Sequence, residues 1–104
     1  MARFDVYANP AAGERRETPF FLDVQNDHVS GLATRIVIPL RSETAFGPRA
    51  QRLNPRVTVA DEALVLDTAA LGAVPLHLLK RPVANLRSHH GDITTALDTL
   101  FGAF

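Results

Sequence analysis

The apolar residues of this chain change their spacing once, and that change limits the possible folds more than any other feature of the sequence. Up to residue 79 they form short stretches with strand-like alternation, separated by glycine, proline, asparagine and aspartate. From residue 86 onward they recur mostly every three or four residues, which is the repeat of one helix face. Short strands followed by one C-terminal helix predict a mainly β (α+β) domain, a small antiparallel sheet or barrel with the helix against it.

Six short segments have the alternation or the apolar runs that favour strands. They are 3–7, 20–25, 34–40, 57–59, 63–66 and 74–79. The isoleucine and valine run at 36–38 indicates burial on both faces, and Pro39 indicates the end of that strand or a sheet edge. Asp61 and Glu62 are expected to form a hairpin turn. Residues 41–56 predict a long polar loop with room for a short helical turn, and 71–73 predict a short helix or turn.

The helical stripe near the C-terminus is expected to pack on the sheet. Its members are Leu86, Ile93, Ala96, Leu97, Leu100, Phe101 and Phe104. Asn85, Ser88 and Asp92 are possible start signals, and Gly102 is typical of a helix stop. We expect Leu100 and Phe101 to dock the helix on the sheet. Phe104 lies beyond the stop, and it suits the core or a partner surface equally well.

The length of the chain predicts one domain, residues 1–104. Its charge balance predicts no strong attraction to charged partners. Eleven basic residues balance eleven acidic ones, so no net field attracts nucleic acid or an anionic membrane. The absence of cysteine excludes disulfide scaffolds, thiolate zinc sites and thiol catalysis. The uncharged stretch 68–79 is too short to span a bilayer, and 1–5 does not resemble a secretory signal. We therefore expect a cytoplasmic protein.

The four histidines do not match a known catalytic or metal-binding motif. His89 and His90 are adjacent and therefore point in different directions on a helix, without the four-residue spacing of a zinc helix. His77 is expected on a strand face and His28 in a turn. No phosphate-binding loop, nucleophile elbow or pair of carboxylates at helical spacing is present in the sequence. The residues therefore predict no catalytic group, no metal and no cofactor.

Several stretches of the sequence form an ordered set with a distinctive spacing. They are Phe4-Asp5-Val6-Tyr7, Phe21-Leu22-Asp23-Val24-Gln25, Ile36-Val37-Ile38-Pro39-Leu40, Val74-Pro75, Val83-Ala84-Asn85-Leu86, Asp92-Ile93 and Ala96-Leu97-Asp98-Thr99-Leu100-Phe101. In order, spacing and total length they resemble the CcdB family, the toxin half of plasmid-type toxin–antitoxin modules. The resemblance covers nearly the whole chain and is interrupted in the loops at 8–19 and 41–54.

The resemblance implies a fold, a target and two kinds of partner. Members of the family are homodimers with an SH3-like antiparallel barrel and a C-terminal helix, and they are not enzymes. Such a toxin binds the A subunit of bacterial DNA gyrase and traps the covalent gyrase–DNA cleavage complex. An antitoxin whose C-terminal half is disordered and acidic wraps the toxin and frees gyrase.

The resemblance also implies which residues contact gyrase. The turn after Asp-Val-Gln contributes His28 and Val29, and the helix end contributes Asp98, Phe101, Gly102, Ala103 and Phe104. The typical family ending is Phe-Trp-Gly-Ile, so this chain lacks the tryptophan that stacks in the gyrase complex. The turn position that is usually apolar in the family is a histidine here. We predict that Phe101 and Phe104 replace the missing aromatic contact.

The antitoxin contact and two other functions complete the sequence-based hypotheses. Arg15, Arg16, Arg49 and Arg52 are predicted to form the polar rim that binds the acidic antitoxin tail. An RNA-cleaving toxin of the MazF/Kid kind shares the barrel, and His28 with Arg35 is the candidate pair for that chemistry. The third hypothesis is a family member that has lost gyrase poisoning and only binds its antitoxin.

Overall fold

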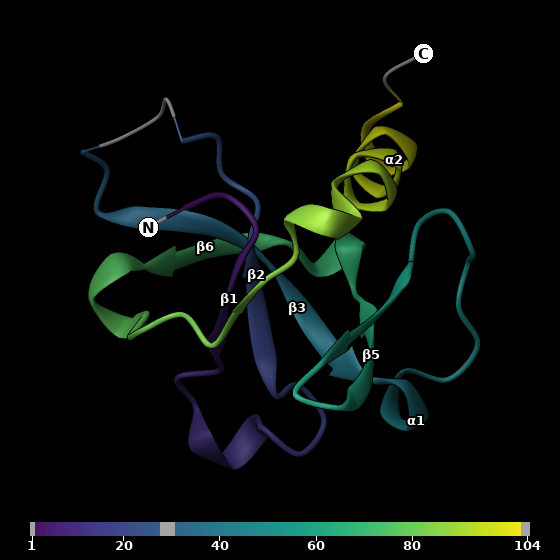
Figure 1. The fold of residues 1–104 in the computed structure, drawn as a ribbon, viewed down its shortest axis with the longest axis horizontal. Helices are drawn as coiled ribbons and strands as arrows, with labels where there is room; N and C mark the ends of the chain where they lie inside the picture. Colours follow the sequence, from purple (N-terminus) through teal and green to yellow (C-terminus); the bar gives the residue numbers. More distant parts are fainter. Residues whose placement is uncertain (1, 28–30, 103–104) are drawn as a thin grey trace.

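The computed structural model describes residues 2–27 and 31–102, which form seven strands, several single helical turns and one longer helix, α2, near the C-terminus (Figure 1). The strands are β1 (Asp5–Ala8), β2 (Phe20–Asp23), β3 (Thr34–Ser42), β4 (Arg56–Val59), β5 (Glu62–Leu66), β6 (Gly72–Pro75) and β7 (Ala84–Asn85). The α-helices are α1 (Glu43–Phe46) and α2 (His90–Phe101), and the 3-10 helices are η1 (Ala12–Glu14), η2 (Thr68–Ala70), η3 (Leu76–Leu78) and η4 (Arg87–His89).

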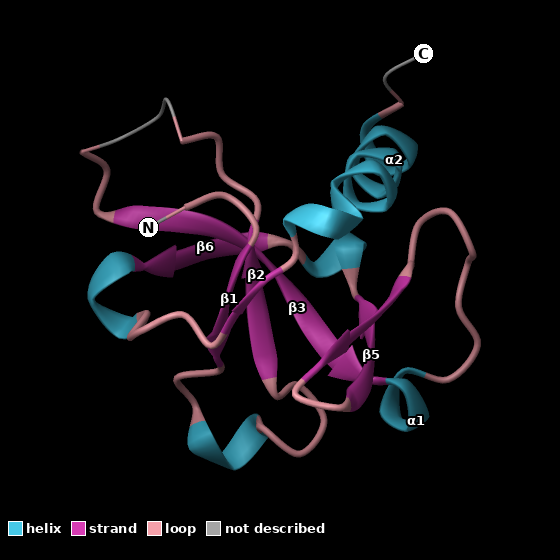
Figure 2. Cartoon of the chain, viewed as in Figure 1, coloured by secondary structure: helices cyan, strands magenta, loops and turns pink. Residues whose placement is uncertain are grey.

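The strands form one antiparallel sheet that curls into a nearly closed barrel. Its order is β4-β5-β3-β2-β1-β7, and β6 pairs with the part of β3 that β5 leaves free. Figure 2 shows the strands at the centre of the molecule and the helical segments around them. This arrangement confirms the predicted mainly β fold with a C-terminal helix.

β3 continues through Pro39 to Ser42, so the prediction that Pro39 ends the strand is wrong. The carbonyl of Pro39 accepts a hydrogen bond from the backbone N–H of Asp67 at 3.0 Å, which shows that this residue faces the β5–β6 side. β6 pairs with β3 from Thr34 to Val37, and β5 pairs with it from Leu40 to Ser42. Proline lies between these ladders, where no strand needs its missing N–H.

Two other predicted boundaries also change in the structure. The hairpin between β4 and β5 turns at Ala60 and Asp61, one residue earlier than predicted, because both adopt the positive φ that a two-residue turn requires. The predicted strand 74–79 instead runs from Gly72 to Pro75, and η3 follows it, so the short helix or turn predicted at 71–73 is wrong. His77 therefore lies on a 3-10 helix and is exposed, not on a strand face.

The core lies between the curled sheet and α2. Its fully buried side chains include Val6, Leu22, Ile38, Leu40, Leu64 and Leu66. Ile93 and Ala96 are fully buried on α2, and Leu97 packs against the same cluster while it remains half-buried. The sequence-predicted helix stripe is thus confirmed at its centre. No helix within the described residues is both long and apolar enough to cross a membrane.

Candidate partner-binding surfaces

The C-terminal end of α2 presents an exposed aromatic side chain. Gly102 adopts the left-handed conformation at φ 68°, and its N–H donates to the carbonyl of Asp98 at 2.8 Å, which ends the helix as the sequence predicts. Leu100 is half-buried, whereas Phe101 is 67% exposed. The prediction that Phe101 docks the helix on the sheet is therefore wrong. This ring is available for contact with another molecule.

The predicted gyrase contact is only partly within the described residues. His28, Val29, Ala103 and Phe104 lie outside them. Among the helix-end residues, Asp98 is half-buried and Gly102 is exposed beside Phe101.

A buried ion pair joins the ends of β2 and β3 just before the predicted contact turn. Arg35 donates from Nε to Asp23 Oδ2 at 2.8 Å and from one terminal nitrogen to Oδ1 at 2.9 Å. Asp23 is fully buried, and Arg35 is 7% exposed. Gln25 adds two hydrogen bonds: its N–H donates to Asp23 Oδ1 at 3.0 Å, and its Oε1 accepts from the N–H of Ile36 at 3.0 Å. We call Asp23, Gln25 and Arg35 together the frame.

The N-terminal segment is tied to the same frame through Asp27. The backbone N–H of Arg3 donates to Asp27 Oδ1 at 2.7 Å, and its Nε donates to the carbonyl of Val24 at 3.1 Å. The Arg35 guanidinium lies 3.7 Å from Asp27. Sequence reasoning did not find this frame as such. The sequence signal that could have indicated it is the presence of Asp23 and Arg35 in two successive apolar strand segments.

Burial changes the titration of two groups in this part of the molecule. Removal from water raises the pKa of the Asp23 carboxyl above its usual value, and the hydrogen bonds and charge of Arg35 oppose that rise. Burial, and secondarily the nearby carboxylates of Asp5 and Asp23, raises the pKa of Tyr7 to about 12. The hydroxyl of Tyr7 lies 3.5 Å from Asp5 Oδ2, as a hydrogen-bond donor. Tyr7 therefore stays neutral at physiological pH.

The four arginines predicted to bind antitoxin do not form one patch. Arg15 and Arg16 follow η1 at the bottom of the view in Figure 1, whereas Arg49 and Arg52 lie in the loop between α1 and β4 at its right. All four are exposed. Arg15 Nε donates to the carbonyl of Asn9 at 2.6 Å, and Arg49 donates to the carbonyl of Asn54 at 3.1 Å. Two of the four thus also brace their own loops.

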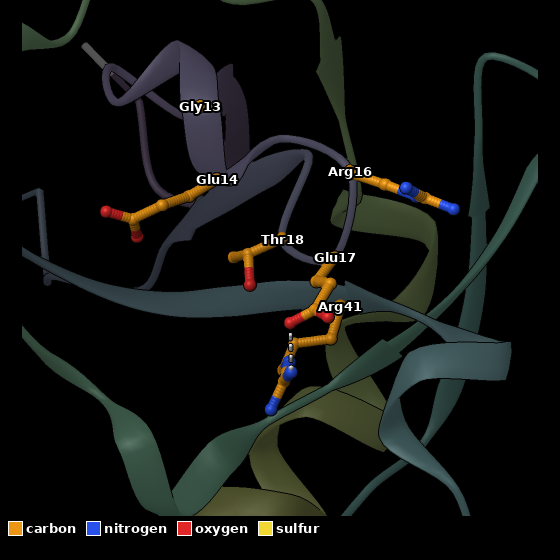
Figure 3. A pocket seen from close by; sticks show the side chains of 6 residues that line it. All are labelled: Gly13, Glu14, Arg16, Glu17, Thr18 and Arg41. Atoms are coloured by element: carbon orange, nitrogen blue, oxygen red, sulfur yellow. Dashed lines mark hydrogen bonds and ion pairs between the residues drawn. The ribbon is translucent and has the colours of Figure 1, made fainter.

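An open hollow of about 420 Å³ lies beside η1 (Figure 3). It is lined by Gly13, Glu14, Arg16, Glu17, Thr18 and Arg41. Arg41 lies 3.5 Å from Glu17 Oε2 and 4.0 Å from Asp67 Oδ2, so its charge is already balanced. In Figure 3 the side chains of Arg16 and Glu14 point away from this pair, in opposite directions. The mixed charges do not favour a ligand of either sign.

Comparison with known protein families decides the relationship. A family model described as CcdB protein matches residues 3–102 of the 104-residue chain. The chain belongs to the CcdB family. Membership makes it a toxin of the toxin–antitoxin kind and confirms the resemblance found in the sequence.

In this CcdB-family protein, Arg35 of the candidate RNA-cleaving pair is held in a structural ion pair. Both ends of the Arg35 guanidinium fork bind Asp23, and the side chain is buried. Its partner in that hypothesis, His28, lies outside the described residues. Within residues 2–27 and 31–102, no cluster of three or more metal-ligating side chains occurs.

Exposed apolar side chains lie at the end of the β3–β6 ladder in this CcdB-family protein. Leu76 is 37% and Leu32 is 51% exposed, and the N–H of Leu76 donates to the carbonyl of Ala33 at 2.8 Å. Leu78 on η3 is also exposed. An exposed apolar patch is a surface that commonly joins subunits.

Proposed function

We propose that this protein acts in the cytoplasm as a toxin that binds the A subunit of DNA gyrase and traps the gyrase–DNA cleavage complex. The toxin acts by binding and not by catalysis. The observation that supports this proposal is the exposed ring of Phe101 beside the helix stop at Gly102. In the typical family ending, an aromatic residue also directly precedes the glycine.

Phe101 replaces part of the binding free energy that the family's tryptophan supplies. An aromatic anchor at the centre of an interface typically contributes about 2–4 kcal/mol, which corresponds to about 30- to 1000-fold in affinity. Phenylalanine buries less area than tryptophan and has no indole N–H, so binding is weaker than with the family ending. Phe101 and Phe104 together carry the aromatic contact.

The decisive test compares plasmid cleavage by purified gyrase in the presence of the parent protein and of Phe101→Ala. Removal of the ring should weaken trapping by at least about 30-fold because the main anchor is lost. Val83→Ala is the matched control, since Val83 is 55% exposed and lies outside the helix end. It should trap gyrase as the parent does.

Phe101→Trp provides the complementary gain of function. Position 101 is helical and exposed, so an indole fits there without strain. Gly102 is unsuitable for the same change because its left-handed φ of 68° disfavours any side chain. Phe101→Trp should trap cleaved DNA at a lower concentration than the parent. If the parent never traps cleaved DNA, the family member that only binds antitoxin becomes the better description.

The toxin acts as a homodimer through the apolar surface beside β6. Leu32, Leu76 and Leu78 supply this surface. Sedimentation equilibrium at low micromolar concentration should give about twice the 11.3 kDa mass of one chain. Leu76→Glu should shift the protein to a monomer because it places a charge in the apolar contact. A monomeric parent would contradict this part of the proposal.

An antitoxin neutralises the toxin by covering surfaces that gyrase needs. Its acidic, disordered half folds on binding and exchanges chain entropy for contacts. Arginines at the rim supply the opposite charge. The separate positions of the Arg15–Arg16 and Arg49–Arg52 pairs suit an extended chain that follows the surface better than a compact domain.

A further inference from the structure

β4 is an edge strand with one side of its backbone unpaired. It pairs with β5 alone among the strands of residues 2–27 and 31–102. The carbonyl of Pro55 accepts from the N–H of Leu66 at 3.1 Å, so residues 55, 57 and 59 point their backbone groups toward β5. The N–H and C=O groups of Arg56 and Thr58 therefore point outward. These four groups form a template for another strand.

Open space lies next to this outward edge. One hollow of about 280 Å³ is lined by Arg56, Val57, Thr58 and His89. A second of about 270 Å³ shares Arg56 and adds Arg49, Gln51, Pro55 and Asp92. The two hollows follow the strand and its N-terminal approach, between β4 and the beginning of α2.

Two guanidinium groups in this groove can bind the carboxylates of an acidic occupant. Arg49 and Arg56 line it, and Asp92 is the only acid among its lining residues. Asp92 lies in the first turn of α2, where the helix dipole already favours a negative charge. Arg56 makes a close ion pair with Glu43 of its own chain. A guanidinium that binds one carboxylate at this exposed position can bind an incoming one.

We propose that the β4 edge binds an extended acidic segment of the antitoxin, which adds a strand to the sheet; this inference rests on the toxin–antitoxin part of the proposed function. The added strand pairs with the outward backbone groups of Arg56 and Thr58. Its alternate side chains face the outer surface beside Arg56, where acidic residues form cross-strand pairs. The remaining side chains face inward beside the buried Val57 and Val59 and are apolar.

The test uses a fluorescein-labelled octapeptide of alternating glutamate and valine, blocked at both ends. A lysine–valine octapeptide of the same pattern is the charge control. Binding is followed by fluorescence anisotropy, and the amide signals of the uniformly ¹⁵N-labelled full-length protein report its location. We expect the glutamate peptide to bind more tightly than the lysine peptide. The amides of Arg56 and Thr58 should shift and become protected from exchange.

Two substitutions at Thr58 isolate the backbone contact. Thr58→Pro removes an N–H that points away from β5, so the β4–β5 ladder is kept while the added strand loses a donor. It should weaken peptide binding at least about tenfold. Thr58→Val retains the N–H and should bind within about twofold of the parent. Thermal unfolding of both variants shows whether the fold is intact.

Charge variants give shifts in opposite directions. Glu43→Gln frees Arg56 and should strengthen binding of the glutamate peptide, whereas Arg56→Gln should weaken it. The proposal is overturned if Thr58→Pro binds like the parent, if both peptides bind equally, or if no binding occurs at millimolar peptide. Gyrase trapping is measured in parallel, and Thr58→Pro should keep it. A parent that binds the peptide at β4 but never traps cleaved DNA refutes the gyrase proposal alone.

Discussion

The frame at the ends of β2 and β3 and the end of α2 hold their characteristic side chains in opposite environments. In the frame, Arg35 is buried and forms a two-point contact with Asp23. At the helix end, Phe101 carries a ring that is 67% exposed. A charged residue is thus inside and an aromatic residue outside, the reverse of the usual preference. Arg35 has its partner within the chain, and the proposed function assigns Phe101 a partner in another molecule.

The difference shows where this protein keeps its stability and where it keeps its binding capacity. A buried charge costs free energy unless its partner is held in place, so the frame fixes the geometry of the strands before the predicted turn. An exposed ring contributes little to folding and remains available for the proposed contact with gyrase. The two regions should therefore respond oppositely to substitution.

The largest expected effect is on the frame. Arg35→Ala leaves the fully buried Asp23 carboxylate without its counter-charge and should lower the free energy of unfolding by about 3–5 kcal/mol. Urea unfolding at fixed protein concentration measures this loss. Arg52→Ala is the control at an exposed arginine and should change stability by less than about 0.5 kcal/mol. Equal effects of the two substitutions would remove the distinction between frame and surface.

The buried side of α2 should behave as core. Ile93→Ala deletes a fully buried side chain from the cluster under the helix and should cost about 3 kcal/mol. Chemical denaturation gives the value. A cost below about 1 kcal/mol would mean that α2 is not docked through this residue.

The pH dependence of stability tests the buried polar groups near the frame. The pKa of Tyr7 is raised to about 12, so between pH 10 and 12 the unfolded chain loses a proton that the folded chain keeps. The associated stability is fully present below pH 10 and decreases as pH rises toward 12, by up to about 2.7 kcal/mol. Tyr7→Phe should lack this decrease when unfolding is measured across the window. The same slope in both proteins would assign it to other groups.

The smallest expected effect on stability is at the helix end. Phe101→Ala should change the free energy of unfolding by less than about 0.5 kcal/mol, because its ring is mostly in water already. Measured beside Ile93→Ala, it separates the two sides of one helix. A loss of more than about 2 kcal/mol would show that the ring is part of the core or of a subunit interface.

Much of the fold was predictable because its signals are local. Turn residues separate the strands. The helix ends at Gly102, which adopts a left-handed conformation that glycine favours over other residues. The errors occurred where contacts with other parts of the chain set the end of a strand. Pro39 continues its strand because β3 changes neighbours at that point. The prediction that strand pairing continues beyond Pro75 failed because η3 begins at Leu76.

The candidate surfaces were less predictable than the fold. The resemblance assigned Phe101 to the gyrase contact, and its exposure agrees with such a role. The arginines were grouped by charge alone, and they lie in two separate loops. The outward side of β4 could not be assigned from sequence, since the direction of each N–H depends on the register with β5.

By itself, the sequence determined the class of this protein: a mainly β domain with one C-terminal helix, in the CcdB family. Periodicity, turn residues and ordered short motifs are properties of the chain, so no partner is needed to interpret them. Only the tertiary structure decided that Arg35 is internal, that Phe101 is external and that β4 has a free edge among the described strands. Those properties depend on distances between residues far apart along the chain. Burial and pairing exist only after the sheet has formed.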